Sequence, residues 1–321
     1  MSSSHLRSPL PVAGDRYVTE AGLETELVFH DGFELPHFIS ATLLEDEVGH
    51  ARLVRYYRSF VALAEAHAMG VLLETPTWRI SADWSPRVGY DRGGRRRLNA
   101  RAAELLWGLR EQSSLPRERF VVSGNIGPRY DGYVAERVMT IEEATRYHDE
   151  QVGDLVAGGV DAISCLTITT SSEAAGIAQA ANAHDVPVAV HLTVETDGRL
   201  PSGEPLGEAF ERIDEAARVA YFGINCAHPR HFSDTLDDAP WVARIGSLRA
   251  NASTKSHAEL DGCETLDDGD PRELADDYAS LLARLPGLRV FGGCCGTDLR
   301  HVRQICNAVR KAGPMSREGA A

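Results

Sequence analysis

The chain has 321 residues, of which 43% are hydrophobic, and a formal net charge of -14 at pH 7. Because this apolar content is enough to bury a core, intrinsic disorder is excluded, and the length suits one large domain. The acidic balance argues against nucleic acid and anionic membrane surfaces as partners. Six cysteines in a chain of this size do not suggest a disulfide framework. They indicate a reducing compartment in which thiols serve as ligands or as core residues.

No targeting or membrane-spanning segment is visible in the sequence. The first 15 residues are rich in serine and proline and hold no apolar stretch of the signal-peptide kind. Apolar runs such as Val71–Leu73 are far shorter than the ~20 residues of a membrane-spanning helix. We therefore expect a soluble, cytoplasmic protein with a flexible segment at 1–15, one domain at 16–312 and a loose tail at 313–321. Nothing in the sequence indicates an oligomeric state.

Short apolar or β-branched segments recur along the chain, and each precedes a longer segment in which apolar residues have helical spacing. None of them is arranged as a hairpin, so the pattern predicts parallel strands joined by crossovers. The predicted strands are Tyr17–Ala21, Val71–Glu74, Phe120–Ser123, Ala162–Thr167, Val188–Thr193, Tyr221–Cys226, Arg244–Leu248 and Arg289–Phe291.

Helices are predicted between these strands. They are expected at Glu47–Met69, Leu98–Leu109, Thr140–Ala157, Ser172–Asp185, Glu208–Val219, a short piece after Pro229, Leu274–Leu285 and Leu299–Val309. Thr140 with Glu143, and Thr170 with Glu173, have the spacing of a capping box and mark helix starts. The basic run Arg92–Arg97 has no interleaved aromatic residues and is interpreted as a solvated loop before a helix. The acidic, turn-rich stretch Ser253–Pro271 is interpreted as a long loop.

Eight strands that alternate with helices within one domain predict a (β/α)8 TIM barrel. A doubly wound open sheet is the main alternative. Such sheets usually have fewer strands, and no G-x-G-x-x-G motif follows the first predicted strand.

Three cysteines follow predicted strands in a way that matters for chemistry. Cys226 ends the sixth strand, and Cys294 and Cys295 follow the eighth, so all three are expected at the carboxyl face of the barrel, where such enzymes build active sites. Three converging thiols without an obvious fourth protein ligand fit an open zinc site. Two alternatives remain: ordinary buried cysteines, and a redox dithiol formed by Cys294 and Cys295. Cys165, Cys263 and Cys306 are interpreted as structural.

Several segments carry a family resemblance. They are Gly223–Cys226 (G-I-N-C), Gly292–Thr297 (G-G-C-C-G-T), Ala21–Leu27 (A-G-L-E-T-E-L), Thr75–Trp78 (T-P-T-W) and Gly124–Pro128 (G-N-I-G-P). These segments are spread over nearly the whole chain and occur in the same order as in one known family. The sequence therefore resembles a divergent subgroup of the homocysteine S-methyltransferase family.

The resemblance implies a barrel whose cofactor, Zn²⁺, is held by Cys226, Cys294 and Cys295 and activates an acceptor thiol, typically homocysteine. The methyl donor of stand-alone members is a sulfonium, S-methylmethionine or S-adenosylmethionine, or else betaine, and the product places the enzyme in methionine biosynthesis. Members that use methylfolate generally carry cobalamin modules, for which this chain has no room, so this donor is disfavoured unless a separate corrinoid protein takes part. The alternative is a zinc- or thiol-binding barrel of the same family that acts on a different thiol or donor, or has no methyltransferase activity.

Departures from the family pattern bear on the substrate. Glu20 stands where the family has Asp, and Trp78 replaces the usual Tyr. Leu166 occupies the place of a Glu that holds the amino group of homocysteine in many members. Asn251 falls in a changed stretch, Arg249–Ser253. The resemblance therefore leaves both the acceptor thiol and the methyl donor open.

Polar residues at the predicted strand ends are candidates for substrate binding. Glu20 is expected to bind an ammonium group, and Gly22 of the first-strand signature is placed beside it. Asn125 and Asn225 are expected to hold a carboxylate or to orient the thiolates, or else to satisfy loop backbone groups.

Other residues near the predicted strand ends complete the candidate site. Thr77 and Trp78 are expected to line it, with Trp78 stacking on a cationic donor or else merely packing at the rim. His191 points into the barrel mouth or is a hydrogen-bonded core residue. His228 and His231, close to Cys226, are weighed as an additional zinc ligand, which would fill the substrate's position.

Overall fold

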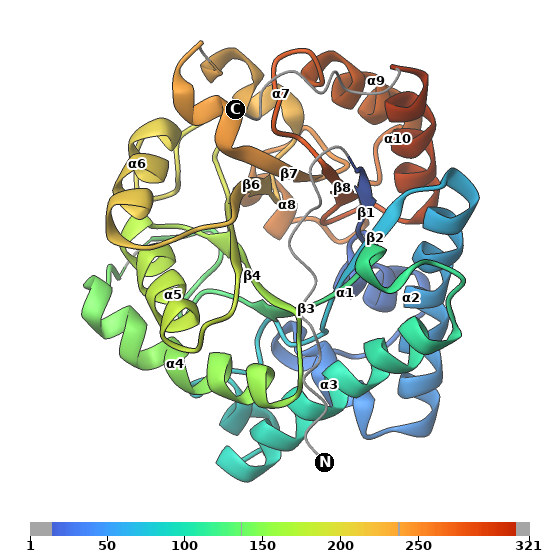
Figure 1. Cartoon of the computed structure of the whole chain (residues 1–321), viewed down its shortest axis with the longest axis vertical. Helices are drawn as coiled ribbons and strands as arrows, with labels where there is room; N and C mark the ends of the chain where they lie inside the picture. Colours follow the sequence, from blue (N-terminus) through green and yellow to red (C-terminus); the bar gives the residue numbers. More distant parts are fainter. Residues whose placement is uncertain (1–14, 136, 237, 313–321) are drawn as a thin grey trace.

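The computed structural model describes residues 15–135, 137–236 and 238–312. Parallel strands form a closed barrel in chain order, and β8 pairs with β1 (Figure 1). The strands are β1 (Tyr17–Val18), β2 (Gly70–Glu74), β3 (Phe120–Ile126), β4 (Ala162–Ile168), β5 (Val188–Leu192), β6 (Tyr221–Asn225), β7 (Ile245–Ala250) and β8 (Val290–Gly293). The prediction of a (β/α)8 barrel is confirmed. Residues 1–14 and 313–321, where the two terminal segments were expected, lie outside the described residues.

Helices surround the barrel (Figure 1). They are α1 (Leu23–Thr25), α2 (Glu47–His67), α3 (Arg92–Gln112), α4 (Ile141–Ala157), α5 (Ser171–Ala183), α6 (Leu206–Ala216), α7 (Pro229–Phe232), α8 (His257–Asp261), α9 (Pro271–Leu281) and α10 (Leu299–Lys311). The predicted caps mark real helix starts: Thr140 and Glu143 form both bonds of a capping box, and Thr170 accepts from the Glu173 N–H. No helix in the described ranges has the length and apolar character needed to cross a membrane.

One segment expected to be a loop is helical, and a second contains a short helix. The basic run Arg92–Arg97 forms the first turns of α3, because Asp91 caps the helix by accepting from the Gly94 N–H at 2.8 Å. Its arginines are stabilised by carboxylates rather than by solvent alone, as in the Arg95–Glu150 pair at 2.5 Å. Within 253–271, Ser256 and Glu259 form a capping box that starts α8. The prediction for 92–97 was wrong because the local cap outweighed the polar composition, whereas 253–271 is mostly loop as expected and holds the short helix α8.

The interior of the barrel changes character along the strands. Its amino-terminal half is an apolar cluster made by Tyr17, Leu72, Val121, Ala162, Ala189, Tyr221 and Val290. Side chains on one face of a strand recur every second residue, and two positions further on the interior is polar. There Ser123 and Ser164 share a hydrogen bond of 2.8 Å, and the buried side chains of Glu74 and His191 lie at the same level of their strands. This polar layer forms the floor of the carboxyl-terminal mouth.

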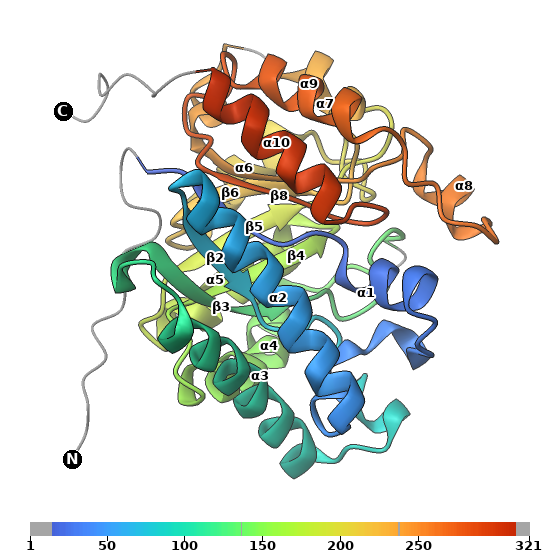
Figure 2. The ribbon, with the colours of Figure 1, turned by 90° about the vertical axis from the view of Figure 1, so that its right-hand side faces the viewer.

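Short elements frame that mouth. Figure 2 shows α1, which follows β1, and α8, which follows β7, at the same end of the barrel. Since both elements follow the carboxyl ends of their strands, this is the end at which the active sites of such barrels are built.

Candidate metal centre and active site

Cys226, Cys294 and Cys295 converge at this mouth. Their sulfur atoms all lie within 4.8 Å of one another, and the sulfurs of Cys226 and Cys295 are 3.4 Å apart. Cys226 directly follows β6, whereas Cys294 and Cys295 directly follow β8. Across the described ranges, this is the one cluster of three or more His, Cys, Asp or Glu side chains close enough to share a metal. The barrel topology therefore brings together the three thiols that the sequence singled out.

The cluster has the donor set of an open zinc site. A tetrahedral zinc ion with Zn–S bonds of ~2.3 Å holds its thiolates about 3.8 Å apart, which is compatible with the spacing of these sulfurs. His228 and His231 do not join the cluster. The His228 Nδ1 atom accepts from the Arg230 N–H at 3.3 Å, and the His231 Nε2 atom lies 2.8 Å from the Thr254 carbonyl. Among the described residues, no further His, Cys, Asp or Glu side chain lies close enough to act as a fourth ligand.

The backbone at Cys226 is held in an uncommon conformation. Its φ of 56° lies in the left-handed region, which costs a non-glycine residue about 1–2 kcal/mol. Three side chains fix its carbonyl: His257 Nε2 at 2.5 Å, Asn251 Nδ2 at 3.0 Å and Thr193 Oγ1 at 3.4 Å. Surroundings that over-determine a strained residue are characteristic of functional sites. Here they aim the Cys226 sulfur at the β8 thiols.

At Gly22, the turn after β1 packs closely against the segment that carries Cys294 and Cys295. A β-carbon at Gly22 would lie 2.5 Å from the Cys294 carbonyl oxygen, and the Gly22 N–H donates to the Thr297 carbonyl at 3.3 Å. Any larger side chain would push the two segments apart. Gly22 therefore allows the turn after β1 to lie close to the segment that carries Cys294 and Cys295.

Tyr133 covers two of the thiols. Its hydroxyl lies 3.1 Å from the Cys226 sulfur and 3.6 Å from the Cys295 sulfur. Its ring packs on that of His257 with centroids 4.3 Å apart. Burial raises the pKa of the Tyr133 hydroxyl well above its usual value, and the neighbouring thiolates raise it further, so the phenol remains a hydrogen-bond donor.

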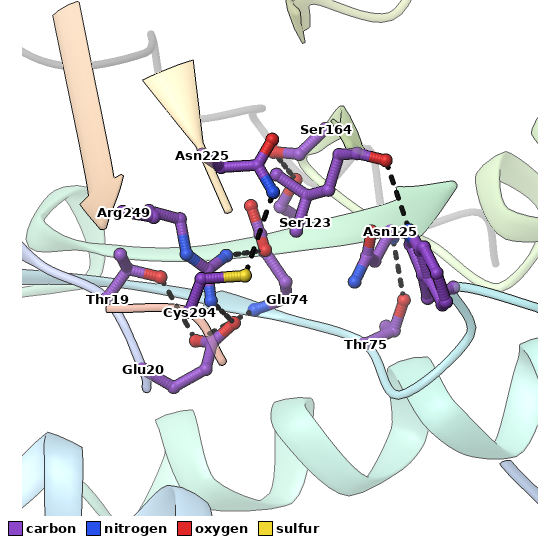
Figure 3. A network of polar contacts seen from close by, with 12 residues as sticks. Thr19, Glu20, Glu74, Thr75, Ser123, Asn125, Ser164, Asn225, Arg249 and Cys294 are labelled. Carbon is purple, nitrogen blue, oxygen red and sulfur yellow. Dashed lines mark hydrogen bonds and ion pairs between the residues drawn. The ribbon is translucent and has the colours of Figure 1, made fainter. Parts of the chain in front are cut away.

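A buried ion network lies beside Cys294 (Figure 3). Arg249 Nη2 is 3.1 Å from Glu20 Oε1, and its Nη1 contacts Glu74 Oε2. Glu20 also accepts from Thr19 Oγ1 at 3.1 Å. Burial raises the pKa of Glu20, while Arg249 lowers it. The carboxylate expected to bind a substrate ammonium group is thus already paired with a guanidinium from β7.

The same arginine shapes the electrostatics of the thiols. The pKa of Cys294 is held well below its usual range by hydrogen bonds from Cys226 and Cys295, and Arg249 contributes to this lowering. The pKa of Cys226 is raised by those same thiol hydrogen bonds and by burial. Arg249 therefore favours the thiolate form of Cys294.

The two predicted asparagines have different surroundings. Asn225 Oδ1 accepts from the Thr167 N–H, and its Nδ2 donates to Thr167 Oγ1, both at 2.8 Å, with the Cys294 sulfur 3.8 Å away. Asn225 thus orients the end of β4 as well as a thiol. By contrast, the side-chain oxygen of Asn125 is buried without a partner among the described residues.

Thr77 and Trp78 form part of the wall at the end of β2. Thr77 Oγ1 donates to the Asn125 carbonyl at 2.7 Å. The Trp78 indole N–H donates to the Leu166 carbonyl at 3.1 Å, and the Arg79 guanidinium lies over its ring at 4.7 Å. One face of the ring considered for a cationic donor is therefore covered by a cation from this chain.

His191 lies inside the barrel, where it is 1% exposed. Neither ring nitrogen has a hydrogen-bond partner in the described part of the chain. Burial lowers its pKa to about 4, so the ring is neutral at physiological pH.

Four contributors to the site were not identified from the sequence: Tyr133, Arg249, His257 and Glu74. Tyr133 reaches the thiols from a loop, which leaves no periodic signal, and His257 contacts the Cys226 carbonyl from the start of the short helix α8. Arg249 and Glu74 lie near the carboxyl ends of β7 and β2 in inward-facing register, and a charged residue at such a position was an available signal.

Comparisons with known proteins agree with this geometry. The family model described as homocysteine S-methyltransferase matches residues 17–309. The methionine synthase of Mycobacterium leprae is 29% identical over 228 residues, which are 67% of this chain but only 18% of that protein. The homocysteine S-methyltransferase YbgG of Bacillus subtilis is 24% identical over 222 residues, which are 65% of this chain and 67% of that protein.

Solved structures support the fold. The homocysteine methyltransferase MmuM from Escherichia coli superimposes in its oxidised form with a TM-score of 0.73 and 19% identity, over 96% of this chain and 99% of that one. Its metallated form gives a TM-score of 0.71 over 94% of this chain and 99% of that one.

Proposed function

The chain belongs to the homocysteine S-methyltransferase family of methyltransferases, and on that premise we propose that it transfers a methyl group to homocysteine and releases methionine. The proposed donor is a sulfonium, S-methylmethionine or S-adenosylmethionine, or betaine. The observation that carries the proposal is the open cluster of three thiols at the carboxyl face of the barrel. It offers three sulfur ligands and leaves one position for an acceptor sulfur.

We propose Zn²⁺ as the resident metal, held by Cys226, Cys294 and Cys295. When bound, it would keep the acceptor sulfur deprotonated at neutral pH. Residues of the chain itself balance charge, orient the thiols and exclude water. Arg249 balances negative charge near Cys294, and Asn225 orients Cys294 through its amide. The Tyr133 hydroxyl lies over Cys226 and Cys295, which keeps bulk water away from these sulfurs.

The reaction is an in-line displacement. The thiolate sulfur attacks the methyl carbon, a new S–CH3 bond forms, and the bond from that carbon to the donor heteroatom breaks. The electron pair of the broken bond stays with the leaving group, which becomes a neutral thioether or a tertiary amine. Because the thiol proton is lost before this step, no general base is required during transfer. Proximity and nucleophile activation therefore carry most of the rate.

The residues predicted for substrate binding take three roles in this proposal. Gly22, Thr77 and Asn225 shape and orient the site through contacts within the chain. Asn125, whose side-chain oxygen has no partner among the described residues, is proposed to accept a hydrogen bond from the substrate. Glu20, Trp78 and His191 are proposed to support the wall of the pocket without binding the substrate directly.

The test presents the zinc-loaded protein with a panel of thiols and methyl donors and follows products by mass spectrometry. Methionine formed from homocysteine and a sulfonium or betaine, and lost in Cys294→Ser, is the expected result. Methylation of a different thiol only would reassign the acceptor. The absence of any methylated thiol with sulfonium, betaine and methyl-corrinoid donors would overturn the proposal.

A further inference from the structure

Two oppositely charged side chains near the thiol cluster, Glu24 and Arg79, have no charged partner. Within the described part of the chain, neither forms an ion pair, although most charged groups around the mouth do, Arg249 with Glu20 among them. A partly buried charge without a counter-charge is unfavourable unless a bound molecule supplies one. The pair therefore points to a ligand that carries both signs of charge.

Glu24 lies on a helix that contacts the segment carrying Cys294 and Cys295. It belongs to α1, whose residue Thr25 accepts from the Gly296 N–H at 3.2 Å, next to Cys294 and Cys295. One carboxylate oxygen accepts from Ser40 Oγ at 2.8 Å, and the same hydroxyl lies 3.4 Å from the Pro76 carbonyl. Burial raises the pKa of Glu24, and the charge of Cys294 raises it further. Through the Ser40 hydroxyl, the carboxylate is linked to the segment after β2, and it lies within electrostatic reach of Cys294.

Arg79 comes from that segment after β2. Its guanidinium carbon lies 4.7 Å from the centre of the Trp78 ring and 4.2 Å from that of Trp84. Its Nε atom is buried and has no acceptor among the described residues. The two indoles lie against the guanidinium, and they leave the Nε–H group for an acceptor that the described residues do not supply.

The neighbouring acids do not fill this role. Burial lowers the pKa of Arg79, whereas Asp131, Tyr133 and Glu24 raise it, so these groups lie within electrostatic reach without touching it. Asp131 uses one oxygen to accept the N–H groups of Tyr133 and Val134, at 2.7 and 3.1 Å.

We propose that Glu24 and Arg79 bind the ammonium and carboxylate groups of an amino-acid thiol whose sulfur reaches Cys226, Cys294 and Cys295. The assignment of the ligand as the acceptor thiol rests on the proposed function. Glu24 then supplies the carboxylate that Leu166 lacks, from the β1 side of the mouth instead of from β4. A planar guanidinium matches a carboxylate in two-point geometry, which suits Arg79 for the other end.

Three thiols separate the two contacts: homocysteine, 4-mercaptobutanoate, which lacks the amino group, and 3-aminopropane-1-thiol, which lacks the carboxylate. Their affinities for the zinc-loaded protein are measured by calorimetry, and KM by product formation. Glu24→Gln is expected to weaken homocysteine and 3-aminopropane-1-thiol at least about tenfold and to leave 4-mercaptobutanoate unchanged. Arg79→Gln is expected to weaken homocysteine and 4-mercaptobutanoate to a similar degree and to leave 3-aminopropane-1-thiol unchanged.

Matched controls are Arg87→Gln, which removes an exposed guanidinium from the same Trp84 ring, and Glu34→Gln, an exposed carboxylate. Both are expected to behave as wild type, and zinc content is expected to be unchanged in all variants. Equal weakening of all three thiols, no weakening, or an altered KM for the methyl donor alone would overturn the pairing. If the wild-type protein methylates none of the thiols, the proposed function fails, while the calorimetric pattern still decides the roles of Glu24 and Arg79.

Discussion

Arg249 Nη2 lies 3.1 Å from Glu20 Oε1, and each side chain is only 5% exposed. The arginine comes from β7 and the glutamate from the turn after β1, so the pair ties together two strands on either side of β8. Glu74 of β2 contacts the same guanidinium. This network places a buried guanidinium between two buried carboxylates beneath the thiol cluster.

Replacing Arg249 by Gln is expected to lower the free energy of unfolding by about 3–5 kcal/mol, because two buried carboxylates lose their counter-charge. Urea denaturation followed by circular dichroism measures the effect. Arg230→Gln is the control: its guanidinium is 53% exposed and pairs with Asp277 at 3.1 Å, so a loss of at most about 1 kcal/mol is expected. Equal losses in the two variants would contradict the role of the network.

Purified anaerobically, the wild-type protein is expected to hold about one zinc ion per chain. Cys226→Ser is expected to lose most of it on dialysis against a chelator, because one of three thiolate ligands is gone. Cys263→Ser is the matched control, since that thiol lies on the loop with α8 and bonds to the Glu259 carbonyl at 3.1 Å. A metal-free protein with a stable Cys294–Cys295 disulfide would contradict the metal site.

Tyr133→Phe keeps the ring on His257 and removes only the hydroxyl over Cys226 and Cys295. Groups that hydrogen-bond to metal ligands typically contribute 10–100-fold in metal affinity, so zinc affinity is expected to fall by about tenfold in a chelator competition. Tyr147→Phe is the control, because its hydroxyl binds Ser81 at 2.9 Å on the α4 side. If both variants hold zinc as tightly as wild type, the Tyr133 hydroxyl has no part in the metal site.

Stability is expected to fall as the pH drops from 6.5 towards 4. Burial lowers the pKa of His191 to about 4 from its ordinary value of 6.5. In that window the unfolded chain binds a proton that the folded protein does not, so unfolding becomes easier as the pH falls. His191→Gln is expected to reduce the loss by about 2–3 kcal/mol, as measured by urea titrations at pH 7 and pH 4.5. An unchanged slope in His191→Gln would refute the assignment.

The apolar periodicity of the helices and the succession of strands could be predicted from the sequence, because both are signals within short stretches of the chain. The positions of Cys226 and of Cys294–Cys295 after their strands placed the thiols at one face of the barrel, and their convergence then follows from barrel closure. The first strand was predicted to reach Ala21, but β1 ends at Val18 because the chain must turn at Gly22 to lie against Thr297.

What could not be predicted depends on contacts between distant segments. Nothing local to Glu20 reveals that Arg249, far along the chain, neutralises it, so an open ammonium site was the simplest expectation. Tyr133 reaches the thiols through a loop whose path is set by the Asp131 turn. His257 was missed for a related reason, since it stands at the start of a helix that was interpreted as loop.

Zinc K-edge X-ray absorption tests the central claim most directly, because it counts the sulfur atoms around the metal before and after the acceptor thiol is added. The account predicts three sulfur neighbours at about 2.3 Å in the zinc-loaded protein, and four at saturating homocysteine. Fewer than three sulfurs at the outset, or a spectrum that homocysteine leaves unchanged, would contradict it.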